Sequence, residues 1–150
     1  MNSNSSTSVF VNRALITCST NNIGDDIQSL AVSLMMPEPD FAIDREKISQ
    51  VQLPSKAVIA GWYKHDETDW PPAPALHPLF VSFHAFRSRC VTRHLDYFAR
   101  AGRIGCRDLA TVDLLKGYGI DAYFSGCVTL TLPELDAEEP NNLPLFVDLD

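Results

Sequence analysis

The stretch from residue 104 to residue 127 constrains the fold most strongly. Two short apolar runs, residues 104–106 and 120–124, flank a segment whose apolar residues recur at helical spacing. Those helical residues are Leu109, Val112 and Leu115, and Gly117 or Gly119 is expected to end the helix. A strand, a helix and a second strand in this order form a unit with parallel strands.

The upstream sequence repeats this alternation. Strands are predicted over residues 13–18, 41–44, 56–62 and 78–84, and residues 128–132 form one more short strand or an extended segment. Two apolar stripes predict helices; they are Ile27, Leu30, Ala31, Leu34 and Val91, Leu95, Phe98, Ala101. Residues 63–77 read as a loop without regular structure. We expect an α/β lobe over residues 13–133, a Rossmann-like parallel sheet with flanking helices.

The two ends differ in composition from this lobe. Residues 1–12 begin with a Ser- and Asn-rich run and are expected to be a disordered tail. Residues 134–144 are acidic, contain proline and read as a linker. Residues 145–150 read as a new buried strand, so we expect a second lobe to begin there and the chain to be the front half of a longer protein.

Charge and cysteine usage narrow the function classes. The net charge of −7 argues against a nucleic-acid or anionic-membrane partner, and no apolar run is long enough for a membrane span. The four cysteines form no CxxC pair, which favours buried free thiols in a reducing compartment, the cytoplasm, and no metal site. The dinucleotide fingerprint GxGxxG and the phosphate-binding motif GxxxxGK[ST] are both absent.

Polar residues follow the predicted strands, and parallel strands would bring them to one edge of the sheet. Behind the first strand lie Asn22, Gly24, Asp25 and Asp26, where a helix is expected to begin. Gly24 would let a ligand approach the free N–H groups of that helix. The alternative is helix capping, which we favour for one of the two aspartates.

The other strand ends offer further candidates. His84 is either a general acid/base or a hydrogen-bonded structural histidine, and Arg107 either holds an anion or pairs with Asp108, Asp25 or Asp26. Trp62 and Trp70 either stack on a sugar ring or serve packing and loop anchoring. Ser125 and Gly126 are candidates at the last strand, and Cys127 reads as structural unless it is exposed with a low pKa.

These stretches, in this order and spacing, resemble the polysaccharide pyruvyl transferase family. The stretches are NNIGDDIQSLA at 21–31, IDRE at 43–46, GW at 61–62, SFH at 82–84, IGCRD at 104–108 and SGCVTLTL at 125–132. The resemblance implies two Rossmann-like halves, as in GT-B glycosyltransferases. It also implies transfer of a pyruvyl ketal from phosphoenolpyruvate, the donor substrate, to a saccharide acceptor of a cell-surface polysaccharide, without a cofactor or metal.

The resemblance also suggests roles for individual residues. His84 would be the general acid/base, Arg107 would neutralise the donor's carboxylate or phosphate, and Asn22 and Asp25 would hold sugar hydroxyls. Alternatives are a non-catalytic saccharide-binding or remnant module, and a fragment of another GT-B-type glycosyltransferase. A separate C-terminal lobe or a second copy of the chain is the protein partner we consider.

Overall fold

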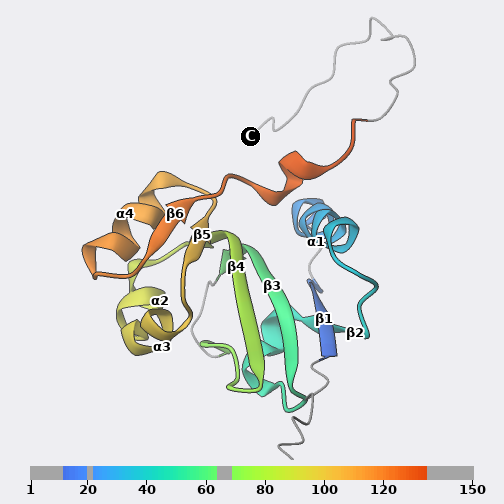
Figure 1. Ribbon diagram of the computed structural model, residues 1–150, viewed down its shortest axis with the longest axis horizontal. Coiled ribbons are helices and arrows are strands. Elements are labelled where there is room, and N and C mark those ends of the chain that lie inside the picture. Colours follow the sequence, from blue (N-terminus) through green and yellow to red (C-terminus); the bar gives the residue numbers. More distant parts are fainter. Residues whose placement is uncertain (1–11, 20–21, 64–68, 135–150) are drawn as a thin grey trace, which may run out of the picture.

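Six parallel strands form one sheet in the order β2-β1-β3-β4-β5-β6 (Figure 1). The computed structural model describes residues 12–19, 22–63 and 69–134. The strands are β1 (Asn12–Thr17), β2 (Phe41–Asp44), β3 (Ser55–Tyr63), β4 (Leu76–Ala85), β5 (Ile104–Cys106) and β6 (Ala122–Phe124). The helices are α1 (Ile23–Met35), α2 (Ser88–Thr92), α3 (Leu95–Arg100) and α4 (Leu109–Gly117), with the 3-10 helices η1 (Arg45–Gln50) and η2 (Val128–Thr131). The predicted α/β, Rossmann-like architecture is confirmed.

The strand order changes direction at β1, which lies between β2 and β3. The chain moves from β1 outward to β2, returns through η1 to β3 on the other side, and then continues in one direction to β6. In open parallel sheets, ligands bind at the carboxyl ends of the strands beside such a switch point. The carboxyl ends of β1 and β3 are therefore the first place to look for a site.

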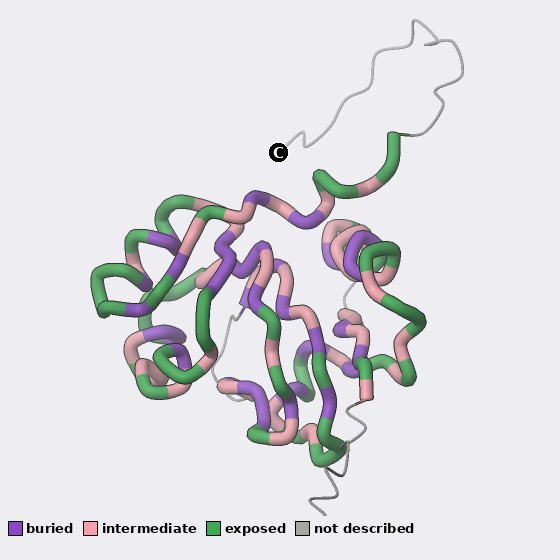
Figure 2. Tube along the Cα trace, in the orientation of Figure 1, coloured by how far each residue is buried: buried purple, intermediate pink, exposed green. Residues whose placement is uncertain are grey.

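Alternate residues of each strand pack into two separate cores, one on each face of the sheet. The larger core holds Ala14 and Ile16 of β1 and the rings of Phe80, Phe83 and Phe98. The smaller core, under α1 and η2, holds Ala31, Val32 and Val128, with Leu15 of β1 packed against it. Figure 2 shows the buried residues running along the strands between these elements.

A bulge interrupts the pairing of β3 with β4 just before their carboxyl ends. One residue of β3 separates Ile59 from Gly61, whereas two residues of β4 separate their partners Phe80 and Phe83. Ser82, the second of these two, is fully buried and has φ of 61°, and Gly61 has φ of 94°. The extra residue lets Phe80 and Phe83 enter the same core although they are three positions apart.

Four local predictions are wrong. Residues 128–132 form the 3-10 helix η2 and not a strand. Its turn is held by the Thr131 hydroxyl, which donates to the Val128 carbonyl at 2.7 Å, and by the backbone N–H of Val128, which donates to Ser82 Oγ at 3.0 Å. In α4, Val112 and Leu115 are buried as predicted, but Leu109 is 64% exposed because it follows the Asp108 cap directly. The stripe predicted for residues 91–101 is divided between α2 and α3.

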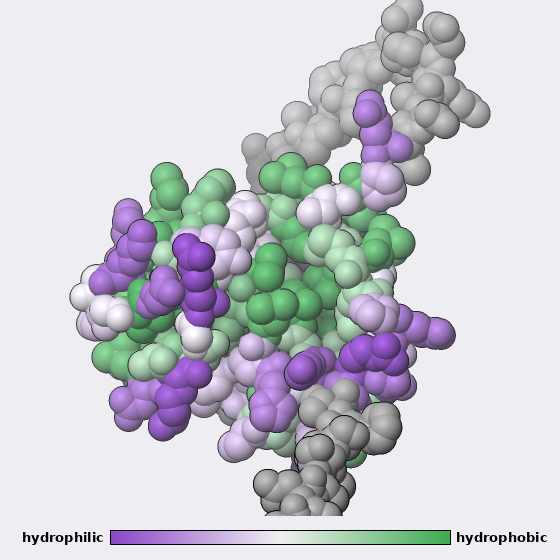
Figure 3. Space-filling view, viewed as in Figure 1, coloured by the Kyte–Doolittle hydropathy of each residue, from purple (hydrophilic) through white to green (hydrophobic). Residues whose placement is uncertain are grey.

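The fourth error concerns the face that α1 turns to the sheet. Ala31 is buried as predicted, but Leu30 and Leu34 are 51% and 60% exposed. The helix is rotated because two polar side chains bind beneath it: Asp25 pairs with Arg45, and the Ser29 hydroxyl donates to the Ile16 carbonyl at 2.9 Å. Leu30 and Leu34 of the predicted stripe therefore lie outside, and apolar side chains gather over α1 in Figure 3.

This orientation of α1 predicts unequal effects of two alanine substitutions. Val32→Ala removes buried methyl groups under the helix and should cost about 2 kcal/mol of unfolding free energy. Leu34→Ala, two residues further on, should cost no more than about 0.5 kcal/mol because Leu34 is exposed. Urea titration of both variants measures the difference. Equal losses would contradict the orientation of α1.

Three predicted segments lie mostly or wholly outside the described residues. The described chain starts at Asn12, so the predicted tail over 1–12 is covered only by its last residue. Of the predicted linker over 134–144, only Glu134 is described, and the predicted strand over 145–150 is outside. These remain predictions.

Candidate functional site

The carboxyl ends of all six strands meet at one edge of the sheet, which we call the polar edge. The predicted candidates Asn22, Gly24, Asp25, Asp26, Trp62, His84, Arg107, Ser125 and Gly126 lie at or just beyond these ends. Their convergence follows from the parallel sheet, as predicted. The contacts of each side chain decide which of them remain available to a ligand.

His84 and Asp108 form a close pair at this edge. Nδ1 of His84 and Oδ2 of Asp108 are 2.5 Å apart, and the two side chains are 25% and 32% exposed. His84 lies near the end of β4, and Asp108 caps α4 directly after β5. The Asp108 carboxylate is fixed in turn by Thr111, whose backbone N–H donates to Oδ1 at 2.8 Å and whose hydroxyl donates to Oδ2 at 3.0 Å.

The protonation of Asp108 determines the tautomer of His84. Burial raises the pKa of Asp108, but the hydrogen bonds from His84 and Thr111 outweigh it and lower the pKa below its usual range. An ionised carboxylate only accepts hydrogen bonds, so Nδ1 of His84 must carry the proton. In the neutral ring Nε2 then has a free lone pair, which is the arrangement of a general base.

Asp108 also links this pair to stability. Its pKa is lower in the folded state, so it stabilises the fold at pH values above its unfolded-state pKa of about 4. That contribution is lost as the pH falls through the folded-state pKa.

Arg107 lies beside His84. The register pairs Phe83 with Cys106, and the Arg107 N–H donates to the Phe83 carbonyl at 2.9 Å, so the next residues of the two strands are neighbours. The predicted alternative, a pair with Asp108, Asp25 or Asp26, does not occur, because Asp108 binds His84 and Asp25 binds Arg45. In the described part of the chain Arg107 forms no ion pair with a carboxylate.

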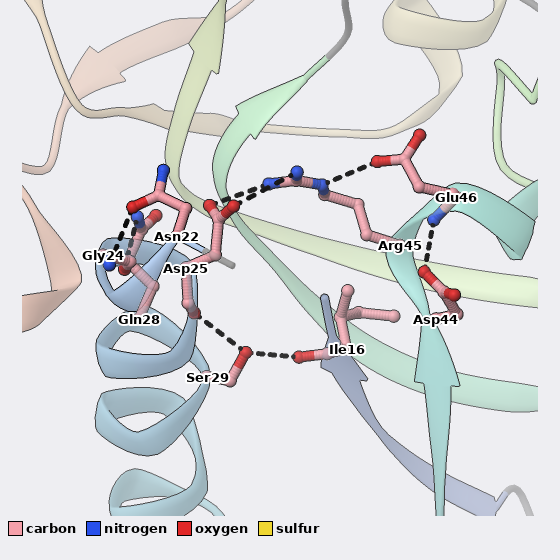
Figure 4. A network of polar contacts seen from close by, with 9 residues as sticks. All are labelled: Ile16, Asn22, Gly24, Asp25, Gln28, Ser29, Asp44, Arg45 and Glu46. Carbon is pink, nitrogen blue, oxygen red and sulfur yellow. Dashed lines mark hydrogen bonds and ion pairs between the residues drawn. The ribbon is translucent and has the colours of Figure 1, made fainter. Parts of the chain in front are cut away.

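A buried ion pair lies at the polar edge, at the switch point between β1 and β3. Nη1 of Arg45 lies 2.9 Å from Oδ1 of Asp25, and both side chains are 8% exposed (Figure 4). A second contact joins Nη2 to Oδ2 at 3.4 Å, and Nε of Arg45 lies 3.0 Å from Glu46. Burial raises the pKa of the neighbouring Cys18 thiol to about 11, so it stays protonated. Asp25 is therefore already occupied within the protein.

The residues that open α1 also serve the fold. Asn22 is the N-cap, and its side chain accepts from the Gly24 N–H at 2.9 Å. The preference for aspartate as the cap is therefore wrong; Asn22 takes that place because its side chain reaches the N–H two residues on. Asp26 is exposed in the first turn. The Gly24 N–H, expected to face a ligand, is bound by Asn22.

The last strand contributes structural hydrogen bonds. The Ser125 hydroxyl accepts from the Ser82 N–H at 2.9 Å and donates to the Cys106 carbonyl at 3.1 Å, and Gly126 is buried with φ of 73°. Burial raises the pKa of the neighbouring Cys127, but hydrogen bonds with Thr129 and Ser82 and the charge of Arg107 lower it below its usual value. Ser125 thus holds the bulge in β4.

The two tryptophans have different roles. Trp70 is 6% exposed, stacks with Phe83 at 6.0 Å between ring centroids, and donates from Nε1 to the Cys90 carbonyl at 3.1 Å. Trp70 is therefore a core residue and is not available to stack on a sugar ring. The loop anchoring expected of it is partly correct, because its ring holds the end of the loop in the core. Trp62 is half-buried at the end of β3, with its ring 4.9 Å from that of Phe86.

A small cavity lies at the switch point of the polar edge. The cavity beside Asp25, Arg45 and Tyr63 has a volume of about 20 Å³, enough for about one water. Three larger cavities have volumes of about 910, 410 and 370 Å³, and Asp44 at the end of β2 lines the last of them. Neither His84 nor Arg107 lines any of these three cavities.

The sequence analysis did not assign a role at the polar edge to two of its residues, Asp108 and Arg45. Asp108 was considered only as a partner of Arg107, although its position after the strand next to β4 makes it a neighbour of His84. Arg45 was not among the candidates, although it follows β2 directly and therefore lies at a strand end, as the predicted candidates do. In both cases the missing information was which strands are adjacent.

The described residues hold no group of three or more side chains suited to a metal ion. None of the helices in this part of the chain has the length and apolar content needed to cross a membrane. Comparison with protein-family models, with curated proteins and with solved structures found no match to this chain.

Proposed function

We propose that this lobe takes part in the transfer of a pyruvyl ketal from phosphoenolpyruvate to a saccharide acceptor of a cell-surface polysaccharide, in the cytoplasm. The proposal rests on the family resemblance of its sequence motifs together with one geometric observation. That observation is the pair formed by His84 and Asp108, with Arg107 next to it on the adjacent strand. General-base and anion-binding groups thus lie side by side on an accessible edge.

The reaction requires these two functions. Two sugar hydroxyls form bonds to C2 of phosphoenolpyruvate, the C2–O bond to phosphate breaks, and C3 gains a proton. Nε2 of His84 would take the proton from an attacking hydroxyl and return it to C3, so one group acts as base and then as acid. The second hydroxyl proton leaves with inorganic phosphate. Arg107 would hold the donor's carboxylate or phosphate through its guanidinium.

Titration calorimetry with phosphoenolpyruvate tests this proposal. We expect binding that is stronger than that of pyruvate or of inorganic phosphate, because the donor carries both anionic groups. Arg107→Gln should weaken binding by about 10- to 100-fold, the effect of losing a hydrogen bond to a charged group. Arg103→Gln is the matched control, since Arg103 is exposed at the opposite end of the same strand, 3.7 Å from Asp121.

The partial exposure of His84 and Asp108, 25% and 32%, favours a second candidate, a saccharide-binding module without catalysis. Both side chains are accessible enough to meet a sugar at the surface. If the folded chain binds no phosphoenolpyruvate, the proposed function fails for this chain alone. Binding of a saccharide, weakened by a change at Trp62 or His84, would then support the module.

A further inference from the structure

The two faces of the sheet are covered unequally. The buried residues of α2, α3, α4 and η1 belong to the larger core, whereas the smaller core on the other face is built from α1 and η2. Right-handed crossovers explain the difference, because only the step from β1 to β2 runs in the direction that places its helix on this second face. Parallel sheets normally have both faces covered, so the face under α1 needs more cover than the described residues supply.

An apolar groove of about 410 Å³ marks the uncovered part of this face, over the first residues of β3 and β4. Met36, Pro37, Val58 and Leu79 are among the residues that line it. Leu79 is 59% exposed although β4 is a central strand. No described helix lies in front of β3 and β4 in Figure 1, and Figure 3 shows apolar side chains, in green, over the same strands. A leucine exposed in the middle of a parallel sheet indicates that an apolar partner belongs there.

The charged residues along the groove are basic. Arg13, Lys56 and His77 line it near the first residues of β1, β3 and β4, and none of the described lining residues is acidic. Arg13 is engaged by Asp40 at 3.3 Å, whereas Lys56 and His77 are exposed. This combination complements an apolar segment that carries negative charge.

The chain contains such a segment shortly after η2. Residues 143–149 read Leu-Pro-Leu-Phe-Val-Asp-Leu, and an acidic run precedes them. Leu132, at the end of η2, packs against the same small core as Val58, which also lines the groove. The chain therefore leaves η2 beside the groove. The nine positions from Glu134 to Leu143 can span up to about 30 Å, which is enough to reach any part of it.

We propose that residues 143–149 pack into this groove and complete the cover of the sheet within the same chain. Their apolar side chains contact Leu79 and Val58, and the acidic residues beside them lie near Lys56. For this segment the proposal replaces the predicted role as the first strand of a second lobe. It goes beyond the proposed function and does not depend on it, because no residue of the polar edge takes part.

Nuclear Overhauser spectra of the full chain test the contact directly. We expect signals between the methyl groups of Leu79 and the ring of Phe146 that do not change with protein concentration. Isotope-filtered spectra of mixed labelled and unlabelled chains distinguish contacts within one chain from contacts between two. Signals only between different copies would overturn the proposal in favour of a dimer, and the absence of any signal would overturn it in favour of the predicted second lobe.

Two alanine substitutions test the same contact through stability. Leu79→Ala and Phe146→Ala should each raise the unfolding equilibrium constant about tenfold, because both remove buried apolar surface, and the double variant should show less than the product of the two effects. Leu109→Ala is the matched control, since Leu109 is 64% exposed on α4, and it should change the constant about twofold or less. Urea titration measures all four variants. An effect of Leu79→Ala no larger than that of Leu109→Ala would show that the groove is empty in solution.

Discussion

Asp25→Ala is expected to destabilise the protein by about 3 kcal/mol, the lower end of the range for breaking a buried ion pair. The substitution leaves the Arg45 guanidinium buried at 8% exposure without its main partner. The remaining contact with Glu46, whose side chain is 48% exposed, offsets only part of this cost. Domains of this size are stable by about 5–15 kcal/mol, so the loss is a large fraction of the total.

A double substitution and a neighbouring control make this result specific. Asp25→Leu with Arg45→Met removes both charges and should come within about 1 kcal/mol of the wild type, because an apolar pair avoids the desolvation cost. Asp26→Ala, next in the chain but exposed, should change stability by no more than about 0.5 kcal/mol. Urea titration with comparison of midpoints and slopes measures all three. A near-zero effect of Asp25→Ala would show that the pair is not formed in solution.

The same ion pair explains why the polar edge was only partly predictable. Asp25 follows an asparagine and a glycine at the start of a helix, a pattern that fits an anion-binding turn or a cap. Its partner Arg45 comes from the end of β2, twenty residues later in the sequence. Only the placement of β2 beside β1 brings the two together. A candidate ligand-binding carboxylate thus proved to be part of the fold.

Six strands were predictable because central parallel strands are nearly continuous apolar runs. The strands predicted over 13–18, 41–44, 56–62, 78–84, 104–106 and 120–124 were each found within two residues. The orientation of α1 was not predictable, because both of its sides carry apolar residues. Of the predicted stripe, Leu30 and Leu34 are exposed, whereas Ala31 is buried together with Val32, which lies outside the stripe. The polar contacts of Asp25 and Ser29 decide between them, and hydrophobic periodicity does not register such contacts.

The bulge in β4 was equally unpredictable from the sequence. Nothing in the sequence Phe-Val-Ser-Phe-His marks Ser82 as a residue with positive φ, since serine rarely adopts this conformation. The conformation is held by Ser125 and Val128, more than forty residues away. Backbone conformations of this kind are concentrated at functional sites, where the surrounding structure maintains them. Here the bulge precedes His84 by two residues, which strengthens the case for His84.

Under the proposed function, His84→Ala in a complete enzyme should lower the turnover number by about 10²- to 10⁴-fold, the usual contribution of general acid–base catalysis. The Michaelis constants should change little, because the lost group acts on protons and not on ground-state binding. Release of inorganic phosphate from phosphoenolpyruvate, in the presence of methyl glycosides with free hydroxyl pairs, measures the rate. A wild-type rate in this variant would remove His84 from the mechanism.

Asp108→Asn tests how Asp108 orients the ring of His84. It should lower the turnover number by a similar factor, but through a change of tautomer. Asparagine keeps the helix cap, which needs only a side-chain oxygen to accept from the Thr111 N–H. Its amide N–H₂ can, however, donate to Nδ1 of His84 and so move the ring proton to Nε2, the atom that must act as base. Asp113→Asn, an exposed change on the same helix, is the matched control.

The ring nitrogens of His84 give a readout that is independent of turnover. Nitrogen-15 chemical shifts at neutral pH should show the proton on Nδ1 in the wild type and in Asp113→Asn, and on Nε2 in Asp108→Asn. The ionised Asp108 carboxylate, whose pKa is held low by His84 and Thr111, requires the first state. If the ring proton stays on Nδ1 in Asp108→Asn while the rate still falls, Asp108 contributes through its charge; if neither changes, it does not position His84.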